Sequence, residues 1–591
     1  MNLGQEFDFA RPVQVAVIAG VMGALSATTA LAGSDASRIR NCEDSDWCSY
    51  HRTVDSAWRY SPLAQINTDN VSDLRPAWIF QPGQVRQGIH STPLAIDGNV
   101  YAITNPATVW KLDGVTGDRV WSYEPEIDQA VLARTFFGHS RSISIGDGRI
   151  YAGMIDGAVV ALDENTGEEA WRKQLIDSAK ETVGFSGSGT FVGSDMFVIC
   201  QNGGEYPIEG KCFGLDPSNG DVKWTFYTTG RGDEHALSTW GGDSWKYGGG
   251  GSWQPGTIDY GNNQIFIGTG NPNPDYDYCG ADCRDTNADG HRPGDNLYTS
   301  STIALDLDTG SLNWYFQEAP SDPYDYDASP GEYVMLNEDG RSLVLHPGKN
   351  GFNHVHDAKT GQPVNVYPDM RSYNWTTGFN LETGQWENML WPKAGEKTLV
   401  CPAIDGGHSW NAGAYSPQTG LFYRNTQEWC MWLTVGVKGG SEGVLGSVER
   451  TVEPVVQAFF NAEFQGTNPP GDTNHAWLTG RDPVSGDIAW EKRYDIIPHS
   501  ALMATAGGLL FNGTTDGYAE AMDAATGALL WRFNNGSGHN GGIISYQTGG
   551  KQYVLFATGH GSYVGRAVAG LNEAKLVNYE ESAAFVAFSL D

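Results

Sequence analysis

The chain has 591 residues, of which 37 are basic and 70 acidic, so its formal net charge is −33. This charge excludes a general nucleic-acid binder, because binding to polyphosphate requires clusters of Lys and Arg. Hydrophobic residues make up 40% of the chain and include 20 Trp, 26 Tyr and 23 Phe, which excludes a disordered protein. The 76 glycines are typical of many strands joined by tight turns and favour an all-β fold.

Residues 1–32 have the pattern of an export signal. An apolar run from 13 to 25 is followed by Ala30-Leu31-Ala32, a cleavage box that precedes Gly33. The run is short for a membrane span, and an uncleaved anchor is the alternative. We therefore expect an exported, periplasmic chain that is cleaved near Ala32, with a single domain over 33–591 and no membrane span in the mature chain.

The eight cysteines are typical of disulfide bonds formed in an oxidising compartment. Three close pairs and one remaining pair are expected: Cys42/Cys48, Cys200/Cys212, Cys279/Cys283 and Cys401/Cys430. The chain contains no CxxCH motif, so it encodes no attachment site for covalent haem.

The strongest pattern is an internal repeat, LDxxTGxxxW, in which a hydrophobic strand ends at Asp, turns at Gly and restarts toward Trp. Six copies share an Asp-to-Trp offset of eight: Asp113/Trp121, Asp163/Trp171, Asp216/Trp224, Asp306/Trp314, Asp482/Trp490 and Asp523/Trp531. A seventh copy begins at Asp357 and has Asn365 in place of Trp. An eighth is split between Trp78 and residues 589–591 at the end of the chain.

These repeats predict a β-propeller, because each small twisted sheet buries its faces only against its neighbours. Eight repeats predict eight blades, closed by pairing of the amino-terminal and carboxyl-terminal strands. We expect the recurrent Trp to pack between blades rather than to take part in chemistry. The long gaps 216–306 and 357–482 are where insertions are expected, and propeller sites lie on the axis where such loops converge.

Several stretches distributed over the chain after residue 33 are distinctive: YSPLAQINTDNVSDLRPAW, GGDSWKYGGGGSW, FIGTGNPNP, RPGDNLYTSS, DPYDYDAS, HPGKNG and MATAGG. Together they resemble the quinoprotein alcohol dehydrogenases, the family of methanol and ethanol dehydrogenases that use pyrroloquinoline quinone (PQQ). The resemblance implies an eight-bladed propeller that holds PQQ and one metal ion on its axis.

The resemblance also implies a metal site and a base. Glu205 in NGGEY and Asn271 in GTGNP match oxygen ligands of the metal. Asp325 in YDYD resembles the catalytic base, which takes the alcohol proton and also lies near the metal. Asp327 matches members that use lanthanides, whereas calcium-type members carry a small or neutral residue. A further carboxylate favours a trivalent lanthanide over Ca²⁺; the alternative is that Asp327 caps a loop by accepting from backbone N–H groups.

PQQ is flat and carries three carboxylates, so its pocket needs a stacking surface and cationic or hydrogen-bonding groups. Trp253 in GGSW resembles the stacking Trp of the family, and Arg141 and Lys349 match its cationic contacts. The resemblance also places Asn202, Gly203, Gly204 and Trp410 at the cofactor, together with Ser409, which stands where relatives often have Asn.

The chain departs from the family at four further places. Relatives often have two adjacent cysteines that form a disulfide ring over the quinone. This chain has Thr135 and Phe136 at those positions, so the ring cannot form here. His90 stands where a glutamate often contacts PQQ, and the sequence leaves a contact by His90 open. Gly187 falls near the position of a pocket Thr. His499 replaces a bulky aromatic, so substrate identity cannot be inherited.

Two further motifs have competing interpretations. Residues 285–296 begin like a calcium loop but end at Asn296 where a bidentate Glu is required, which favours a solvated, disulfide-braced insertion. The glycines of 248–252 lack the Lys-Ser/Thr and helix of a phosphate loop and predict a turn that leads to Trp253.

The resemblance implies a periplasmic, PQQ-dependent dehydrogenase that oxidises primary or secondary alcohols and passes electrons to a soluble cytochrome c. One alternative keeps this chemistry and changes the substrate to a bulky polyol, sugar or cyclic secondary alcohol. A second alternative is a propeller scaffold that binds envelope proteins. A scaffold would not explain why the chain carries the ligand residues that match the family. The sequence leaves a homodimer open.

Overall fold

The computed structural model describes residues 35–83, 85, 88–134, 139–178, 180–181, 183–187, 189–273, 276, 292–329, 331–435, 462–559 and 582–591. The expected signal 1–32, the pair Thr135 and Phe136, the pair Cys279/Cys283 and loop residues 285–291 lie outside these ranges. Strands dominate the described part of the chain, so the predicted all-β class is confirmed. None of the helices in these ranges has the length and apolarity needed to cross a membrane.

The helical elements of the described ranges are short: α1 (Ala36–Arg40), α2 (Gln129–Arg134), α3 (Glu234–Leu237) and the 3₁₀ turns η1 (Val71–Asp73) and η2 (Ser244–Tyr247). The elements α3 and η2 lie in the predicted insertion between Asp216 and Asp306.

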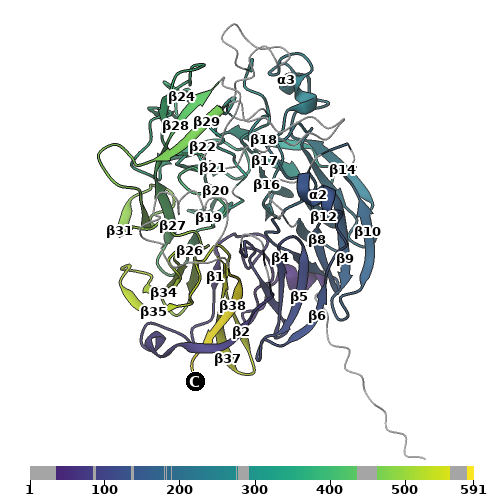
Figure 1. Ribbon diagram of the computed structural model, residues 1–591, viewed down its shortest axis with the longest axis vertical. Helices are drawn as coiled ribbons and strands as arrows, with labels where there is room; N and C mark the ends of the chain where they lie inside the picture. The colour runs from purple at the N-terminus through teal and green to yellow at the C-terminus, as the bar shows by residue number, and fades with distance from the viewer. Residues whose placement is uncertain are drawn as a thin grey trace, which may run out of the picture. The chain divides into compact units, whose positions relative to one another are not determined.

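Eight sheets of the described residues have four or five strands (Figure 1). Five of these are meanders of consecutive strands. They are β3 (Leu94–Ile96), β4 (Asn99–Thr104), β5 (Thr108–Asp113) and β6 (Arg119–Tyr123); β7 (Ser144–Gly146), β8 (Arg149–Gly153), β9 (Ala158–Asp163) and β10 (Glu169–Gln174); β11 (Thr190–Gly193), β12 (Met196–Cys200), β13 (Lys211–Leu215) and β14 (Val222–Tyr227); β15 (Thr257–Asp259), β16 (Gln264–Gly268), β17 (Ser301–Asp306) and β18 (Leu312–Gln317); β19 (Val334–Glu338), β20 (Arg341–Pro347), β21 (Phe352–Asp357) and β22 (Pro363–Pro368).

The other three sheets combine strands from distant parts of the chain. They are, in order across each sheet, β26 (Ala414–Ser416), β27 (Leu421–Glu428), β30 (His475–Arg481) and β31 (Ile488–Tyr494); β1 (Tyr60–Ser61), β32 (Met503–Thr505), β33 (Leu509–Gly513), β34 (Tyr518–Asp523) and β35 (Leu529–Asn534); β2 (Arg75–Phe80), β38 (Ala584–Ser589), β37 (Lys551–Thr558) and β36 (Ile543–Thr548). No sheet of the described ranges closes on itself.

The predicted insertion between Asp357 and Asp482 carries two additional small sheets. They are the hairpin β23 (Gly378–Asn380) and β24 (Gln385–Glu387), and the three-stranded sheet β25 (Thr398–Val400), β28 (Cys430–Val435) and β29 (Ala462–Thr467). A disulfide between Cys401 and Cys430 ties the end of β25 to the start of β28.

The two ends of the described chain meet in one sheet. Strand β2 pairs antiparallel with β38, with Trp78 opposite Ala587 and Phe80 opposite Phe585. In Figure 1, β2 lies against β38 and β37 close to the carboxyl terminus. The expected pairing of these terminal strands is therefore found.

The repeat motif is explained by one turn between the third and fourth strands. In the first copy, Asp113 Oδ1 accepts the backbone N–H groups of Val115 and Thr116, both at 2.9 Å. Gly117 has a φ of +74°, and a Cβ there would lie 2.6 Å from the Trp78 ring. Glycine is therefore required twice, for the left-handed turn and for the approach of the indole.

The recurrent Trp joins each sheet to the next. Trp78 Nε1 donates to the carbonyl of Gly114, the residue after the repeat Asp, at 3.1 Å. Five further copies bond the equivalent carbonyl of the following repeat: Trp121 to Glu164, Trp171 to Pro217, Trp224 to Leu307, Trp314 to Ala358 and Trp490 to Ala524. The predicted packing role of this Trp is confirmed.

The copy without Trp uses a different aromatic residue. Tyr367, two residues after Asn365, donates its hydroxyl to the Pro483 carbonyl at 2.9 Å, and its ring covers Gly486. Trp531 makes an edge-to-face contact with Phe588, with ring centroids 5.0 Å apart.

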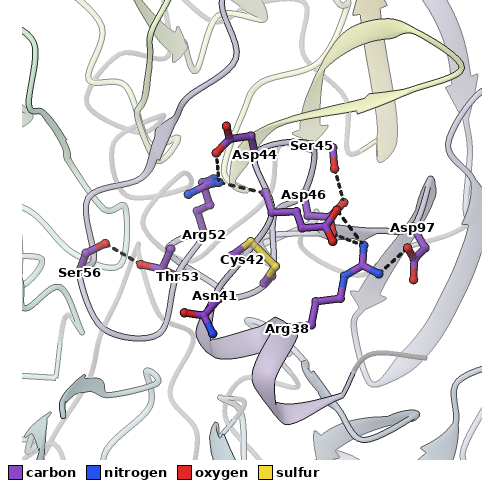
Figure 2. Close-up of a disulfide and its surroundings, with 12 residues drawn as sticks. Arg38, Asn41, Cys42, Asp44, Ser45, Asp46, Arg52, Thr53, Ser56 and Asp97 are labelled. Atoms are coloured by element: carbon purple, nitrogen blue, oxygen red, sulfur yellow. Dashed lines mark hydrogen bonds and ion pairs between the residues drawn. A yellow bond between two sulfur atoms is a disulfide. The ribbon is translucent and has the colours of Figure 1, made fainter. Parts of the chain in front are cut away.

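Three of the four expected disulfides lie within the described residues and are confirmed. They join Cys42 to Cys48, Cys200 to Cys212 and Cys401 to Cys430. Figure 2 shows the first, beside which Arg38 bridges Asp46 and Asp97 at 2.6 Å each. Because Asp97 lies between β3 and β4, this cluster fixes the disulfide loop to the first sheet.

Residues 35–61, here called the amino-terminal segment, contact all eight of the larger sheets. Helix α1 packs against β7 and β11. Main-chain hydrogen bonds join Trp47 to Ala95 of β3, Val54 to Ile258 of β15, Ser56 to Met335 of β19, Trp58 to Tyr415 of β26, Arg59 to Ala504 of β32 and Ser45 to Gln547 of β36.

Arg59 anchors this segment from a fully buried position. Its guanidinium donates to three main-chain carbonyls, of Leu502 at 2.8 Å, Tyr50 at 2.6 Å and Ile543 at 2.9 Å. These carbonyls belong to the amino-terminal segment and to the chain at β32 and β36. Burial lowers the pKa of Arg59 to about 10, so the group stays charged at neutral pH.

We expect Arg59→Met to lower the free energy of unfolding by about 3 kcal/mol or more, because hydrogen bonds from a charged donor contribute ~1.5–3 kcal/mol each. Arg341→Met is the matched control, since Arg341 is half exposed and pairs with Asp357 at the surface. The control should change stability by less than ~1 kcal/mol. Denaturant unfolding of both variants checks this, and equal small losses would contradict the anchoring role.

Candidate active site

The predicted site residues lie in two kinds of loop. Loops that enter the first strand of a sheet carry His90, Arg141, Trp253, Asp325, Asp327, Ser409, Trp410 and His499. Loops between the second and third strands carry Glu205, Asn271 and Lys349. In an antiparallel meander both kinds of loop lie at the same end of the sheet, opposite the repeat turns. The topology alone therefore gathers these residues at one end.

Two of the predicted carboxylates share a buried cation. Lys349 Nζ lies 3.1 Å from Asp325 Oδ1 and 3.1 Å from Asp327 Oδ2. All three side chains are at most 7% exposed. Burial alone would lower the pKa of Lys349, but the two carboxylates raise it above its ordinary value, so the amine stays charged.

Asp327 also binds the loop that carries Asn271. Its Oδ1 accepts the backbone N–H of Asn271 at 2.7 Å, and its Oδ2 accepts from Trp253 Nε1 at 3.3 Å. The alternative role considered for Asp327, capping of a backbone N–H, is therefore realised in the structure. The same contacts place Asp327 between the predicted cofactor and metal residues.

Glycines bring the other predicted metal ligands close together. A Cβ on Gly204 would lie 1.7 Å from Asn271 Oδ1, and one on Gly270 would lie 3.1 Å from Asp327 Oδ1. Glu205, which follows Gly204, is partly exposed. Burial, and then the charge of Asp327, raise the pKa of the Glu205 carboxyl above its ordinary value.

Asp325 occupies an unusual backbone position. Its φ is +68°, a conformation that few residues other than glycine adopt. Asp322 stabilises this turn by accepting the N–H of Tyr326 at 2.8 Å and the Ser300 hydroxyl at 2.7 Å. Burial raises the pKa of Asp322 to about 6. The repeat pattern gave no sign of Asp322, although it stands in the DPYDYD stretch.

Arg141 lies between two indoles. Its guanidinium carbon is 4.4 Å from the Trp253 ring centroid and 5.1 Å from that of Trp410. The side chain is 9% exposed, and its Nε and Nη1 have no hydrogen-bond partner among the described residues. Burial lowers the pKa of Arg141 to about 10, which leaves the group cationic. Buried charged donors of this kind require an anionic or carbonyl partner.

Three buried histidines extend from Trp410. The His90 ring stacks on Trp410 with centroids 5.2 Å apart and contacts the tilted His139 ring at 4.2 Å. The His499 ring centroid lies 5.9 Å from that of Trp410. The structure therefore places both predicted histidines beside a predicted cofactor residue. His139 was not singled out from the sequence, although it stands in the same GHSRS stretch as Arg141.

Asp405 is a further buried carboxylate that sequence reasoning missed. Burial raises its pKa to about 6, while Lys349 and Arg141 act in the opposite direction. The side chain of the predicted residue Ser409 lies beside it. Gly407, two residues after Asp405, donates its N–H to the Lys349 carbonyl at 2.9 Å. This bond joins the loop of Asp405 to the loop of Lys349.

The remaining predicted positions are backbone contacts. Gly203 accepts the N–H of Gly251 at 3.0 Å, and the N–H of Asn202 donates to Gly184 at 2.9 Å. Gly187 lies so close to Trp253 that a Cβ would be 2.8 Å from the Trp253 carbonyl oxygen. The stretch 248–256 leads to Trp253 and β15 without a helix, as expected.

These residues fit a flat, anionic group such as PQQ. Arg141 supplies buried N–H donors that no described residue accepts, Trp253 and Trp410 supply aromatic faces, and Lys349 supplies a second cation. For a metal, Glu205, Asn271 and Asp327 supply hard oxygen donors. No group of three or more His, Cys, Asp or Glu in the described ranges is arranged to hold a metal ion, so the amide of Asn271 is needed to complete such a set.

The chain is similar to known proteins over most of its length. The family model described as "PQQ: Glucose/ethanol/alcohol dehydrogenase, beta-propeller domain" matches residues 47–369 and 376–554. The quinohemoprotein alcohol dehydrogenase ADH-IIG of Pseudomonas putida is 31% identical over 582 residues, which cover 92% of this chain and 77% of the relative. The quinoprotein ethanol dehydrogenase of Pseudomonas aeruginosa is 30% identical over 554 residues, with 86% of this chain and 85% of the relative covered.

A solved structure of a "Europium-containing methanol dehydrogenase" has a TM-score of 0.82 and 28% sequence identity, and covers 93% of this chain and 99% of that one. The fold is thus a β-propeller. With the family model spanning well over half of the chain, the protein belongs to the PQQ β-propeller family of quinoprotein alcohol dehydrogenases.

Proposed function

We propose that this protein is a periplasmic, PQQ-dependent dehydrogenase that oxidises primary or secondary alcohols to aldehydes or ketones. The observation that supports this most directly is the buried Arg141 guanidinium, which lies between Trp253 and Trp410 and has two nitrogens without a partner in the part of the chain that the structure describes. We further propose that the eight larger sheets are the blades of one closed propeller, in which each repeat aromatic contacts the following sheet.

In this proposal, Arg141 and Lys349 would bind anionic and carbonyl oxygens of PQQ, and Trp253 and Trp410 would supply aromatic surfaces beside it. The oxygen donors of Glu205, Asn271, Asp325 and Asp327 would hold the metal. When bound, PQQ supplies the two-electron acceptor, and the metal supplies the positive charge that polarises it. Trivalent lanthanides are favoured over Ca²⁺ because Asp327 adds a carboxylate.

Asp325 acts as the base that accepts the proton from the alcohol hydroxyl. Lys349, 3.1 Å from Asp325 Oδ1, fixes the orientation of this carboxylate. The turn around Asp322 holds Asp325 in its left-handed conformation, so the base is positioned before substrate enters. A soluble cytochrome c would be the electron acceptor. The net charge of −33 favours an acceptor with a basic docking face.

Reconstitution tests the whole proposal. We expect the full chain, supplied with PQQ and a light lanthanide, to reduce an artificial dye in the presence of small alcohols. Omission of PQQ or of metal should remove the activity. A chain that binds PQQ and metal but oxidises no member of a panel of primary, secondary, cyclic and polyhydroxylated alcohols would contradict it.

We expect Asp325→Asn to lower kcat by ~10²–10⁴-fold, because the amide keeps the shape of the side chain but cannot accept the alcohol proton. PQQ occupancy is measured spectrophotometrically on the same sample, since Asp325 also contacts Lys349. Near-normal turnover at full occupancy would refute the role of Asp325 as base.

We expect lanthanide-supported activity to exceed Ca²⁺-supported activity in the parent. Asp327→Asn should reduce this preference by about tenfold or more, because the amide removes the charge but still accepts the Asn271 N–H. Asp327→Ala removes both functions and serves as the comparison. If Asp327→Asn kept the lanthanide preference at full metal and PQQ loading, the capping bond alone would explain Asp327.

A further inference from the structure

The Tyr50 hydroxyl lies where three loops of the proposed cofactor site meet. It donates to the carbonyl of Trp410 at 3.3 Å. The side chains of Gln254 and Thr92 lie beside the same hydroxyl. Gln254 directly follows Trp253, and the N–H of Thr92 donates to the Arg141 carbonyl at 3.1 Å. One hydroxyl is therefore in contact with the segments that carry both indoles and the guanidinium.

Tyr50 itself does not belong to any of these loops. It is part of the amino-terminal segment, where its carbonyl accepts from Arg59 Nη1 at 2.6 Å. Its ring packs edge-on against His51 at 4.7 Å, and the Arg59 guanidinium lies 5.8 Å from the ring centroid. His51 is fixed in turn by a 2.7 Å hydrogen bond with the Gly331 carbonyl. The position of the hydroxyl is thus set by contacts outside the site.

The charge state of Tyr50 suits a hydrogen-bond donor. The side chain is 6% exposed, and burial raises its pKa above the ordinary value, although Arg59 and Arg141 act in the opposite direction. The phenol is therefore neutral across physiological pH. A neutral phenol has one proton to donate, which the Trp410 carbonyl takes.

We propose that Tyr50 is a positioning residue of the PQQ site, which sets the spacing of Trp253 and Trp410 around Arg141. This inference rests on the proposed function. The amino-terminal segment contacts all eight larger sheets, so through Tyr50 it connects the assembly of the sheets to the geometry of the site. Loss of the hydroxyl then loosens the packing of Trp253 and Trp410 around Arg141 without removing any group that touches the cofactor.

The test is Tyr50→Phe in the full chain, with Tyr546→Phe as the matched control. Tyr546 lies in β36, in the same sheet as β2, and is also buried. Its hydroxyl donates to the main-chain carbonyl of Gly114 at 2.7 Å. We expect Tyr50→Phe to raise the Kd for PQQ about 5- to 10-fold, as for the loss of one buried hydrogen bond. The absorption spectrum of bound PQQ should shift, while kcat at saturating PQQ should remain within about twofold of the parent. The control should bind PQQ as the parent does.

Two results would overturn the proposal. One is an unchanged Kd for PQQ in Tyr50→Phe, and the other is an equal weakening in both variants, which would indicate general destabilisation. If Tyr50→Phe did not fold, Gln254→Met would take its place, because it removes the amide beside the hydroxyl; an unchanged Kd there would also overturn the proposal. Failure of the parent to bind PQQ would instead refute the proposed function, so the two failures are distinguishable.

Discussion

The contact on which the architecture depends is an indole ring against a glycine of the next sheet. Trp314, for example, donates to the Ala358 carbonyl at 3.1 Å, and its ring lies 2.5 Å from where a Cβ of Gly361 would stand. The Asp of each repeat shapes the turn, and the Gly leaves space for the ring. Because each motif completes its contact with a residue of another motif, the sheets stabilise one another in sequence rather than separately.

This arrangement separates stability from chemistry. The repeat turns and their indoles lie at one end of the sheets, whereas the loops with Arg141, Trp253, Asp325 and Lys349 lie at the other. Rigid strands therefore support loops that can differ in sequence without disturbing the contacts between sheets. The site consequently tolerates groups that cost stability, such as a left-handed Asp325 and several buried carboxylates.

The repeat offset was sufficient to predict the strands, the turns and the packing role of Trp, because these depend on residues close in sequence. Tyr367 was missed since it replaces Trp two positions later than the pattern requires. Asp405 and Tyr50 were missed for a different reason. Tyr50 meets Trp410 across 360 residues, and Arg59 meets Ile543 across 484, so no local pattern records these contacts. The cofactor positions were predicted from family resemblance rather than from periodicity.

The charges of the site bear on the metal ion of the proposed function. Four buried or partly buried carboxylates, Glu205, Asp325, Asp327 and Asp405, surround the cations Lys349 and Arg141. Burial raises the pKa of both Glu205 and Asp405, and the charge of Asp327 raises that of Glu205 further, so the residues of the site by themselves favour fewer negative charges than the sequence supplies. A metal ion bound as proposed would reverse this effect, because it would stabilise the ionised carboxylates. The carboxylates of PQQ would add further negative charge, and each additional anion increases the advantage of a trivalent over a divalent ion.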